Sequence, residues 1–361
     1  MTGVMAEDEQ STWWRRNWKL VVNVITLAAL VILAYAIRHQ LGQTLRDLHH
    51  INAWVLLLII PIEFLNYHGQ TRLYERLFAT VGNKLEYWAL YRVALELNMV
   101  NHVFPSGGVT GLSYFNLRVR RYNIRAGKAT LVHAMKLILT FLSFEVLLLV
   151  GMFVLAAAGR ASNLTIFIGT AVTTLLLVGT LIFTYIIGSK TRINHVLTAL
   201  TRFLNRVIRI VRPRSPETIN LEKAHGAFDE LHDTYEQFRS RKQELQVPFL
   251  YALLMNITEV AAVYVVYVAF GHWVNVGAVI LAYAIANFAG LVSVLPGGIG
   301  VYEALMVGIM SSAGVPAALT LPVTVMYRVV NTLVQIPLGY VLYHGALSEG
   351  DKQMVSNANT E

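Results

Sequence analysis

The sequence predicts an all-α polytopic membrane protein with about six full spans and two re-entrant hairpins in an inverted repeat. The first observation is composition: of 361 residues, 55% are hydrophobic and 14% charged, whereas soluble domains carry about a quarter charged residues. The second is a series of apolar runs near the roughly 20 residues that cross a bilayer. The third is a pair of Pro/Gly interruptions inside apolar sequence, at residues 105–111 and 296–300.

Both interruptions combine a proline with several glycines. Residues 105–111 read Pro-Ser-Gly-Gly-Val-Thr-Gly, and residues 296–300 read Pro-Gly-Gly-Ile-Gly. Proline removes a helix hydrogen bond, and glycine permits backbone that a helix cannot hold. Unwound backbone at membrane depth is tolerated only where it is buried in protein or lines a cavity. Paired interruptions in matching halves of a chain therefore indicate a transporter binding site.

The apolar runs give the expected order of helices. Full spans are predicted at residues 20–37, 51–67, 128–155, 164–187, 247–270 and 317–343. The hairpins are predicted at 85–117 and 280–313, each containing one interruption. Between the second span and the first hairpin, residues 69–84 carry Arg72 and Arg76 beside apolar side chains. This stretch is expected to lie along the membrane surface.

Charge bias predicts the orientation. Lys and Arg flank the first hairpin on both sides, whereas the flanks of the second, 271–277 and 311–316, contain neither. Both ends of the first hairpin are therefore expected in the cytoplasm and both ends of the second outside, with cytoplasmic termini. The predicted organisation is a cytoplasmic N-terminal segment at 1–19, a transmembrane domain at 20–345 with a basic cytoplasmic loop at 188–246, and a flexible tail at 346–361.

The long polar loop carries much of the net charge of +8. Seven basic residues precede its first acid, Glu217: Lys190, Arg192, Arg202, Arg206, Arg209, Arg212 and Arg214. Apolar residues interleave with them at helical spacing, which is typical of an amphipathic helix, so residues 188–214 are predicted to bind an anionic leaflet. A positive-inside topology signal explains the same charges equally well. Either way the charge indicates the inner membrane face and no nucleic acid.

Charged residues within the expected spans are the strongest functional candidates, because a buried charge without a role is costly. Lys136 and Arg328 follow the two interruptions at nearly equal spacing, 28 residues after Gly108 and 30 after Gly298. Glu259 lies in the span before the second hairpin. Glu303 lies directly after the second interruption, where the helix dipole also favours a carboxylate.

Uncharged polar residues share helix faces with these charges. Asn331 lies one turn after Arg328 on the last span, and Asn98 and Asn101 share a face of the first hairpin arm. Polar stripes also hold membrane helices together. For three residues this is the favoured explanation: Asn256, Gln335 and Ser143.

The helices that begin after the interruptions predict an anion site. Their free N–H groups and positive dipole ends suit a phosphate or carboxylate, with Lys136 and Arg328 as counter-charges. The predicted substrate site combines both interruptions with the polar residues of the spans. Its members are Asn98, Asn101, Pro105, Gly107, Gly108, Gly111, Lys136, Glu259, Pro296, Gly297, Gly298, Gly300, Glu303, Arg328 and Asn331.

Nothing in the sequence indicates catalysis. Cysteine is absent, which excludes disulfides and thiolate chemistry. There is no P-loop, no H-E-x-x-H pattern and no nucleophile elbow, and the histidines lack metal-ligand spacing. We expect no enzyme activity, no catalytic residue, no metal and no cofactor.

Residues 296–303, Pro-Gly-Gly-Ile-Gly-Val-Tyr-Glu, resemble the signature of the lysylphosphatidylglycerol synthase transmembrane-domain family, also called flippase-like domain proteins. The earlier Pro-x-Gly-Gly followed by an Arg-rich turn adds to the resemblance, although Val109 and Thr110 stand where many members have a Gly-Glu pair. The resemblance implies a prokaryotic plasma (inner) membrane protein. In bifunctional members this domain moves an aminoacylated phospholipid between leaflets, and a soluble synthase domain, not expected here, makes it.

Three functions remain open at this point. The leading hypothesis is a flippase or scramblase acting on a phospholipid or polyprenyl-phosphate head group, with membrane lipid as its partner. The second is a non-transporting scaffold that recruits an envelope enzyme through residues 188–246. The third is an ion-coupled carrier of a small solute. A homo-oligomer is compatible with each of them.

Overall fold

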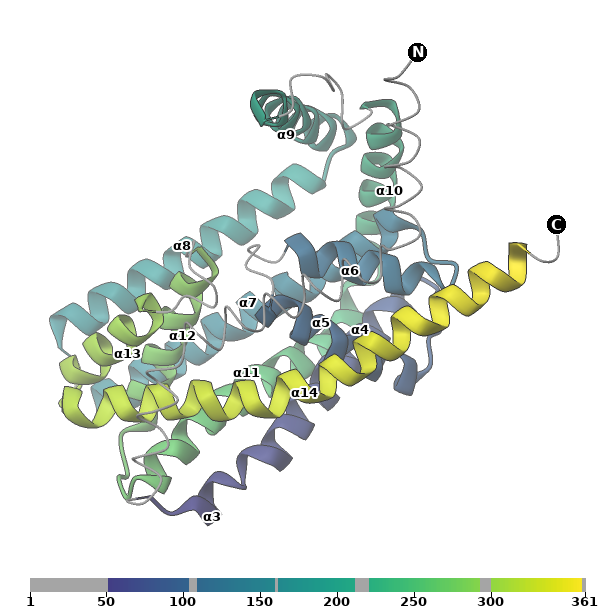
Figure 1. Cartoon of the computed structure of the whole chain (residues 1–361). Helices are drawn as coiled ribbons and strands as arrows, with labels where there is room; N and C mark the ends of the chain where they lie inside the picture. Colours follow the sequence, from purple (N-terminus) through teal and green to yellow (C-terminus); the bar gives the residue numbers. More distant parts are fainter. Residues whose placement is uncertain (1–50, 104–108, 160–161, 212–220, 293–299, 359–361) are drawn as a thin grey trace.

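The computed structural model describes residues 51–103, 109–159, 162–211, 221–292 and 300–358, which are helical throughout with no strand among them (Figure 1). The helices are α3 Ala53–Leu56, α4 Ile59–Thr80, α5 Tyr87–Val103, α6 Val109–Arg120, α7 Ala126–Ala157, α8 Asn163–Ile187, α9 Lys190–Val211, α10 Leu221–Ser240, a 3-10 turn Lys242–Leu245, α11 Gln246–Ala269, α12 Val276–Val292, α13 Val301–Ser312 and α14 Ala317–Ala358. The predicted N-terminal segment and first span lie outside the described residues.

Within the described residues, four helices are long and apolar enough to cross a membrane, which confirms an all-α polytopic membrane protein. They are Ala126–Ala157, Ile166–Ile187, Lys242–Ala269 and Ala317–Tyr343, and each matches a predicted span. Shorter apolar helices at Val276–Phe288 and Val301–Ser312 form the arms of the second predicted hairpin. The span predicted at 51–67 falls in α3 and α4, and its hydropathy is diluted because α4 carries several polar residues.

The expectation that residues 69–84 lie along the membrane surface is wrong. They continue α4 as one helix to Thr80, and Leu73, Tyr74, Leu77 and Phe78 have no exposed surface. These side chains pack in a hydrophobic cluster with residues of α5, α6 and α7. The alternation of cations with apolar residues therefore reflects a helix whose apolar side is covered by protein. Neighbouring helices contact the face that was expected to contact lipid.

Each predicted hairpin packs against the long helix that follows the other hairpin, which is an exchange of partners between the two halves. Helix α5 of the first hairpin packs along α14, which follows the second hairpin. Helix α12 of the second hairpin packs along α7, which follows the first. Two close glycine contacts make this possible. A Cβ atom on Gly339 of α14 would lie 2.7 Å from the Leu95 carbonyl oxygen of α5, and one on Gly277 would lie 2.4 Å from the Gly151 oxygen of α7.

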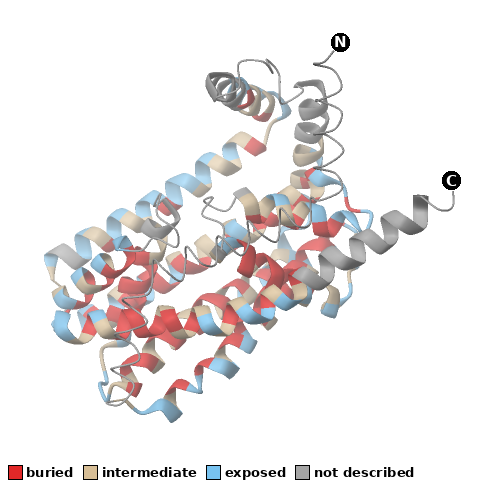
Figure 2. Ribbon diagram, viewed as in Figure 1, coloured by how far each residue is buried: buried red, intermediate tan, exposed pale blue. Residues whose placement is uncertain are grey.

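The centre of the bundle is α4 lying along α11, with α7 and α14 on either flank (Figure 1). Burial is concentrated there, whereas α8 is the most exposed of the four spans, with 11% of its apolar window buried (Figure 2). Polar side chains on α4, α7, α11 and α14 therefore meet inside protein.

The long polar loop folds into α9 and α10. Lys190 at the start of α9 pairs with Asp233 of α10 at 2.8 Å, and His232 contacts the Ile187 carbonyl oxygen at 2.9 Å. α10 packs against α7, so this region is attached to the membrane domain. At the other end of the chain, α14 continues beyond residue 345 to Ala358, and the stretch predicted as a tail is helical up to that residue.

Candidate functional site

The second interruption ends at Gly300, where α13 begins. Gly300 has a φ of 87°, in the left-handed region that glycine adopts without strain. Its backbone N–H donates to Glu303 Oε2 at 2.6 Å, and the other carboxylate oxygen of Glu303 pairs with Arg328 Nη1 of α14. The Arg328 guanidinium also lies over the Tyr302 ring, 5.2 Å from its centroid. Three predicted site residues, Gly300, Glu303 and Arg328, are thus brought together.

The Glu303 carboxylate occupies the position that the sequence assigned to a bound anion. It accepts the N–H at the start of α13 and binds the nearest cation, and its side chain is only 8% exposed. A carboxylate at a helix N-terminus is favoured by the helix dipole and by charge-assisted hydrogen bonds. The site therefore has the chemistry of an anion site, with a side chain of the protein as its present anion.

A second cluster is centred on Glu259 of α11. Its Oε2 accepts a hydrogen bond from the Tyr327 hydroxyl of α14 at 2.9 Å, and its Oε1 accepts one from Asn66 Nδ2 of α4 at 3.3 Å. Tyr283 of α12 and Lys136 of α7 interact with the same carboxylate. The predicted residues Lys136 and Glu259 therefore interact electrostatically within the bundle.

A chain of hydrogen bonds extends from this cluster along α14. Asn331 Nδ2 donates to the Tyr327 hydroxyl at 3.4 Å, and Gln335 Nε2 donates to Asn331 Oδ1 at 2.8 Å. Gln335 Nε2 also donates to Glu63 Oε2 of α4 at 3.2 Å. The stripe of α14 is therefore both a contact between helices and a connection between two carboxylates, Glu63 and Glu259.

The asparagines of the first hairpin belong to different contacts. Asn98 exchanges two hydrogen bonds with Gln70 of α4, at 3.3 and 3.4 Å. Asn101 packs on Gly111, where a Cβ atom would lie 1.9 Å from the Asn101 Oδ1 atom. Gly111 is thus needed so that α5 and α6 can approach each other. None of the hydrogen bonds found for Asn98 in the described residues connects it to the Glu259 cluster.

The first hairpin has its own buried ion pair. Arg118 of α6 binds Glu96 of α5 through Nε at 2.6 Å and through a second nitrogen at 2.9 Å, and the Tyr114 hydroxyl donates to the same carboxylate at 2.8 Å. A glutamate and an arginine are thus in contact within the first hairpin, whereas Glu303 of the second hairpin pairs with Arg328 of the following helix α14. The remaining predicted site residues, Pro105, Gly107, Gly108, Pro296, Gly297 and Gly298, lie outside the described residues.

Four residues of the polar clusters are not among the predicted site residues, namely Glu63, Asn66, Tyr327 and Gln335. The sequence does place Glu63 and Asn66 on one face of the predicted span 51–67, with the same spacing as Asn256 and Glu259 on α11, and it places Gln335 on the stripe of Arg328 and Asn331. Tyr327 has no comparable sequence pattern, because a tyrosine in an apolar helix is expected to serve only in packing.

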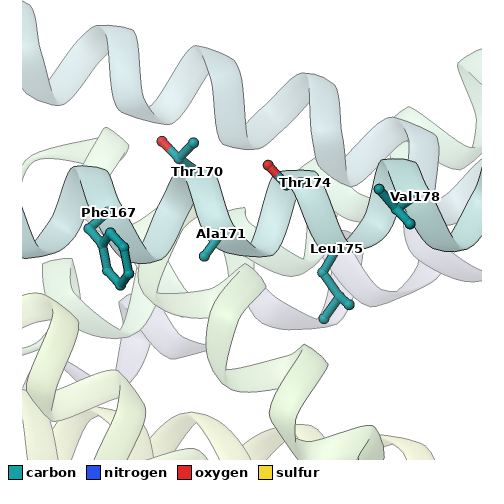
Figure 3. Close-up of a pocket in the computed structure, with 6 residues that line it drawn as sticks. All are labelled: Phe167, Thr170, Ala171, Thr174, Leu175 and Val178. Carbon is teal, nitrogen blue, oxygen red and sulfur yellow. The ribbon is translucent and has the colours of Figure 1, made fainter.

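Two other features contribute no polar chemistry. Among the described residues, no group of three or more His, Asp or Glu side chains is arranged to hold a metal ion. An open, apolar hollow follows one face of α8 and contains no charged side chain (Figure 3). It is lined by Phe167, Thr170, Ala171, Thr174, Leu175 and Val178.

These observations define a helical membrane domain whose core contains charged side chains contributed by α4 to α7, α11, α13 and α14. Residues 20–339 match the model of the lysylphosphatidylglycerol synthase TM region, and the chain belongs to this family. It is similar to the UPF0104 membrane protein PH1989 of Pyrococcus horikoshii, with 27% identity over 53% of this chain and 56% of the relative.

A UPF0104 membrane protein of Methanothermobacter thermautotrophicus is 33% identical over 30% of this chain and 32% of its own length. UPF0104 membrane protein MJ1595 of Methanocaldococcus jannaschii is 22% identical over 45% of this chain and 46% of its own length. The matches therefore span about half or less of these curated relatives.

Proposed function

We propose that the protein is a lipid flippase or scramblase and moves a phospholipid or polyprenyl-phosphate head group between leaflets. The observation that carries this proposal is the Glu303 carboxylate held by Arg328 and the Gly300 N–H inside an apolar bundle. A phosphate group, like this carboxylate, is negatively charged and accepts charge-assisted hydrogen bonds from arginine and from backbone N–H groups. A phosphate head group can therefore take its place, whereas the lipid tails stay in the bilayer.

In this mechanism the incoming phosphate displaces Glu303 from Arg328. Exchange of one anion for another keeps the arginine paired throughout, so no uncompensated positive charge is left inside the membrane. Lys136 supplies a second cation on the neighbouring span. The released Glu303 carboxylate is free to contact a cationic group on the head, such as an amino-acid ester.

The proposal includes an inverted repeat, in which α4 to α7 correspond to α11 to α14 and the hairpins are re-entrant. The exchange of partners supports it, since α5 packs along α14 as α12 packs along α7. Hydrogen bonds between the halves also correspond: Ser143 of α7 bonds Asn256 of α11, and Gln335 of α14 bonds Glu63 of α4. Such repeats place substrate near the midplane of the membrane.

We also propose that α9 lies on the anionic leaflet of the prokaryotic plasma membrane, with both termini in the cytoplasm. Residues 188–214 carry seven cations and no acid, and residues 190–211 of this segment are one helix. Each cation near an anionic surface contributes about 1 kcal/mol of attraction. The helix would keep the domain oriented while the hairpins act on lipid. No enzyme activity is part of the proposal.

The test is translocation of labelled lipids in proteoliposomes by the wild type, Arg328→Gln and Lys136→Gln, with Arg239→Gln of the exposed Arg239–Glu236 pair as control. Loss of a charged hydrogen bond costs about 1.5–3 kcal/mol, so each site variant should be slower by about tenfold or more. If no lipid moves above the rate in empty liposomes, for any head group or ion gradient, the scaffold hypothesis replaces this one. If lipid moves and all variants match the wild type, the site is wrong.

A further inference from the structure

Two carboxylates, Glu63 of α4 and Glu259 of α11, are connected by the hydrogen-bonded side chains of α14, and they differ in their surroundings. Glu259 accepts hydrogen bonds from Tyr327 and Asn66 and faces Lys136. Glu63, only 2% exposed, accepts one hydrogen bond from within the described part of the chain, from Gln335 Nε2 at 3.2 Å. Donors and a cation stabilise an ionised carboxylate. Of the two carboxylates, Glu259 therefore has more groups around it that stabilise an anion than Glu63 has.

The charges of this cluster sum to an excess of one negative charge when all are ionised. Glu63 and Glu259 are negative and interact with each other, and Lys136 supplies one positive charge. In the part of the chain that the structure describes, the other titratable groups that interact with Glu63 are phenols, Tyr67 on its own helix and Tyr327 on α14. A net charge in a low-dielectric interior is costly, and one proton removes it.

Gln335, which contacts Glu63, has a side-chain oxygen that could accept a hydrogen bond from a protonated Glu63. Gln335 Oε1 is buried and has no hydrogen-bond partner among the described residues. A half-turn of the Gln335 amide would place this oxygen where a protonated Glu63 can donate to it. The amide nitrogen currently bonds both Glu63 and Asn331, so the turn would also change the chain of hydrogen bonds that leads to Tyr327 and Glu259.

We propose that Glu63 is a proton-binding residue that couples lipid movement to the proton gradient, an inference that rests on the proposed function. The protonated cluster is neutral, whereas the deprotonated cluster is negative and repels an anionic head group. Proton and phosphate therefore favour each other's binding, and by linkage the effect is reciprocal. One proton carried with one singly charged lipid makes the cycle electroneutral, and the proton returns to water from Glu63 on the opposite side.

The first test measures leaflet distribution of a labelled, singly charged phospholipid in proteoliposomes under a gradient of one pH unit, with a protonophore-treated sample as reference. One proton per lipid predicts about tenfold accumulation in the leaflet on the alkaline side, because one pH unit corresponds to about 1.4 kcal/mol. Glu63→Gln, which mimics the protonated acid, should move lipid without accumulating it. Glu63→Asp should restore accumulation, and Glu145→Gln, an intramembrane carboxylate outside the cluster, should behave as wild type.

Accumulation that survives in Glu63→Gln, or is absent from a wild type that does move lipid, overturns the inference and leaves the proposed function standing. A wild type that moves no lipid with or without the gradient overturns the proposed function. In that case, or if Glu63→Gln does not fold, infrared difference spectra of the wild type decide. They should show a protonated carboxylic acid that loses its proton as pH rises and whose band shifts in Glu63→Asp. A spectrum without such a band, or a band unchanged in Glu63→Asp, overturns the inference.

Discussion

The pair of Glu303 and Arg328 makes a quantitative prediction for stability. Their side chains are 8% and 18% exposed, so they are largely removed from water. Removing one partner of a buried pair leaves the other charge uncompensated, which costs about 3–5 kcal/mol, whereas neutralising both leaves no such charge. Because Arg328 retains some exposure and contacts the Tyr302 ring, we expect the lower end, about 3 kcal/mol, for Arg328→Gln.

The assay is a double-mutant cycle of Arg328→Gln, Glu303→Gln and the double variant, with unfolding in mixed detergent micelles followed by tryptophan fluorescence. The double variant should recover about 2 kcal/mol of the loss in Arg328→Gln, because residues in direct contact are not additive. Arg239→Gln, which breaks an exposed pair, should cost less than about 1 kcal/mol. An Arg328→Gln variant as stable as Arg239→Gln, or strictly additive effects in the cycle, would refute the reasoning.

Three further predictions follow from particular positions. Gly300→Ala should destabilise by about 1–2 kcal/mol through backbone strain, because no atom of the described residues lies within 4 Å of its added Cβ. Gly308→Ala, within α13, should be neutral or stabilising, and thermal unfolding of the two variants checks this. Gly339→Ala should separate α14 from α5 and lower both stability and transport, and unchanged unfolding would mean that the contact is not close. In this cysteine-free chain, single cysteines at Lys84 and His272 should label from the cytoplasm and from outside respectively, and labelling from one face would contradict the inverted repeat.

The sequence predicted those features of the fold that depend on local pattern. Apolar length located the four long spans within a few residues, because a bilayer requires that length whatever the neighbours. It misjudged residues 69–84, since a helix half covered by protein has the same periodicity as one lying on lipid. The exchange of partners between the hairpins is a long-range property and has no local signature.

The parts of the candidate site that depend on local sequence pattern were also predicted, whereas its contacts between helices were not. Glu303 follows a visible break in the helix, and Lys136 and Arg328 are conspicuous as buried cations. Their spacing did not show that Glu303 itself would occupy the anion position beside Arg328, because that contact joins α13 to α14 in three dimensions. The shared face of Glu63 and Asn66 was visible in the sequence, but it did not show that Glu63 would contact Gln335, because that contact joins α4 to α14.

The most direct test of the central claim is the head-group selectivity of the wild-type protein in liposomes. Two labelled lipids with the same tails are compared, one with a phosphate head group and one with an uncharged sugar in its place. If Arg328 and the Gly300 N–H recognise phosphate, the phosphate lipid should cross at least about tenfold faster above the empty-liposome rate, corresponding to about 1.4 kcal/mol of recognition. Equal acceleration of both lipids, or of neither, would contradict the claim that this site carries a phosphate head group across the membrane.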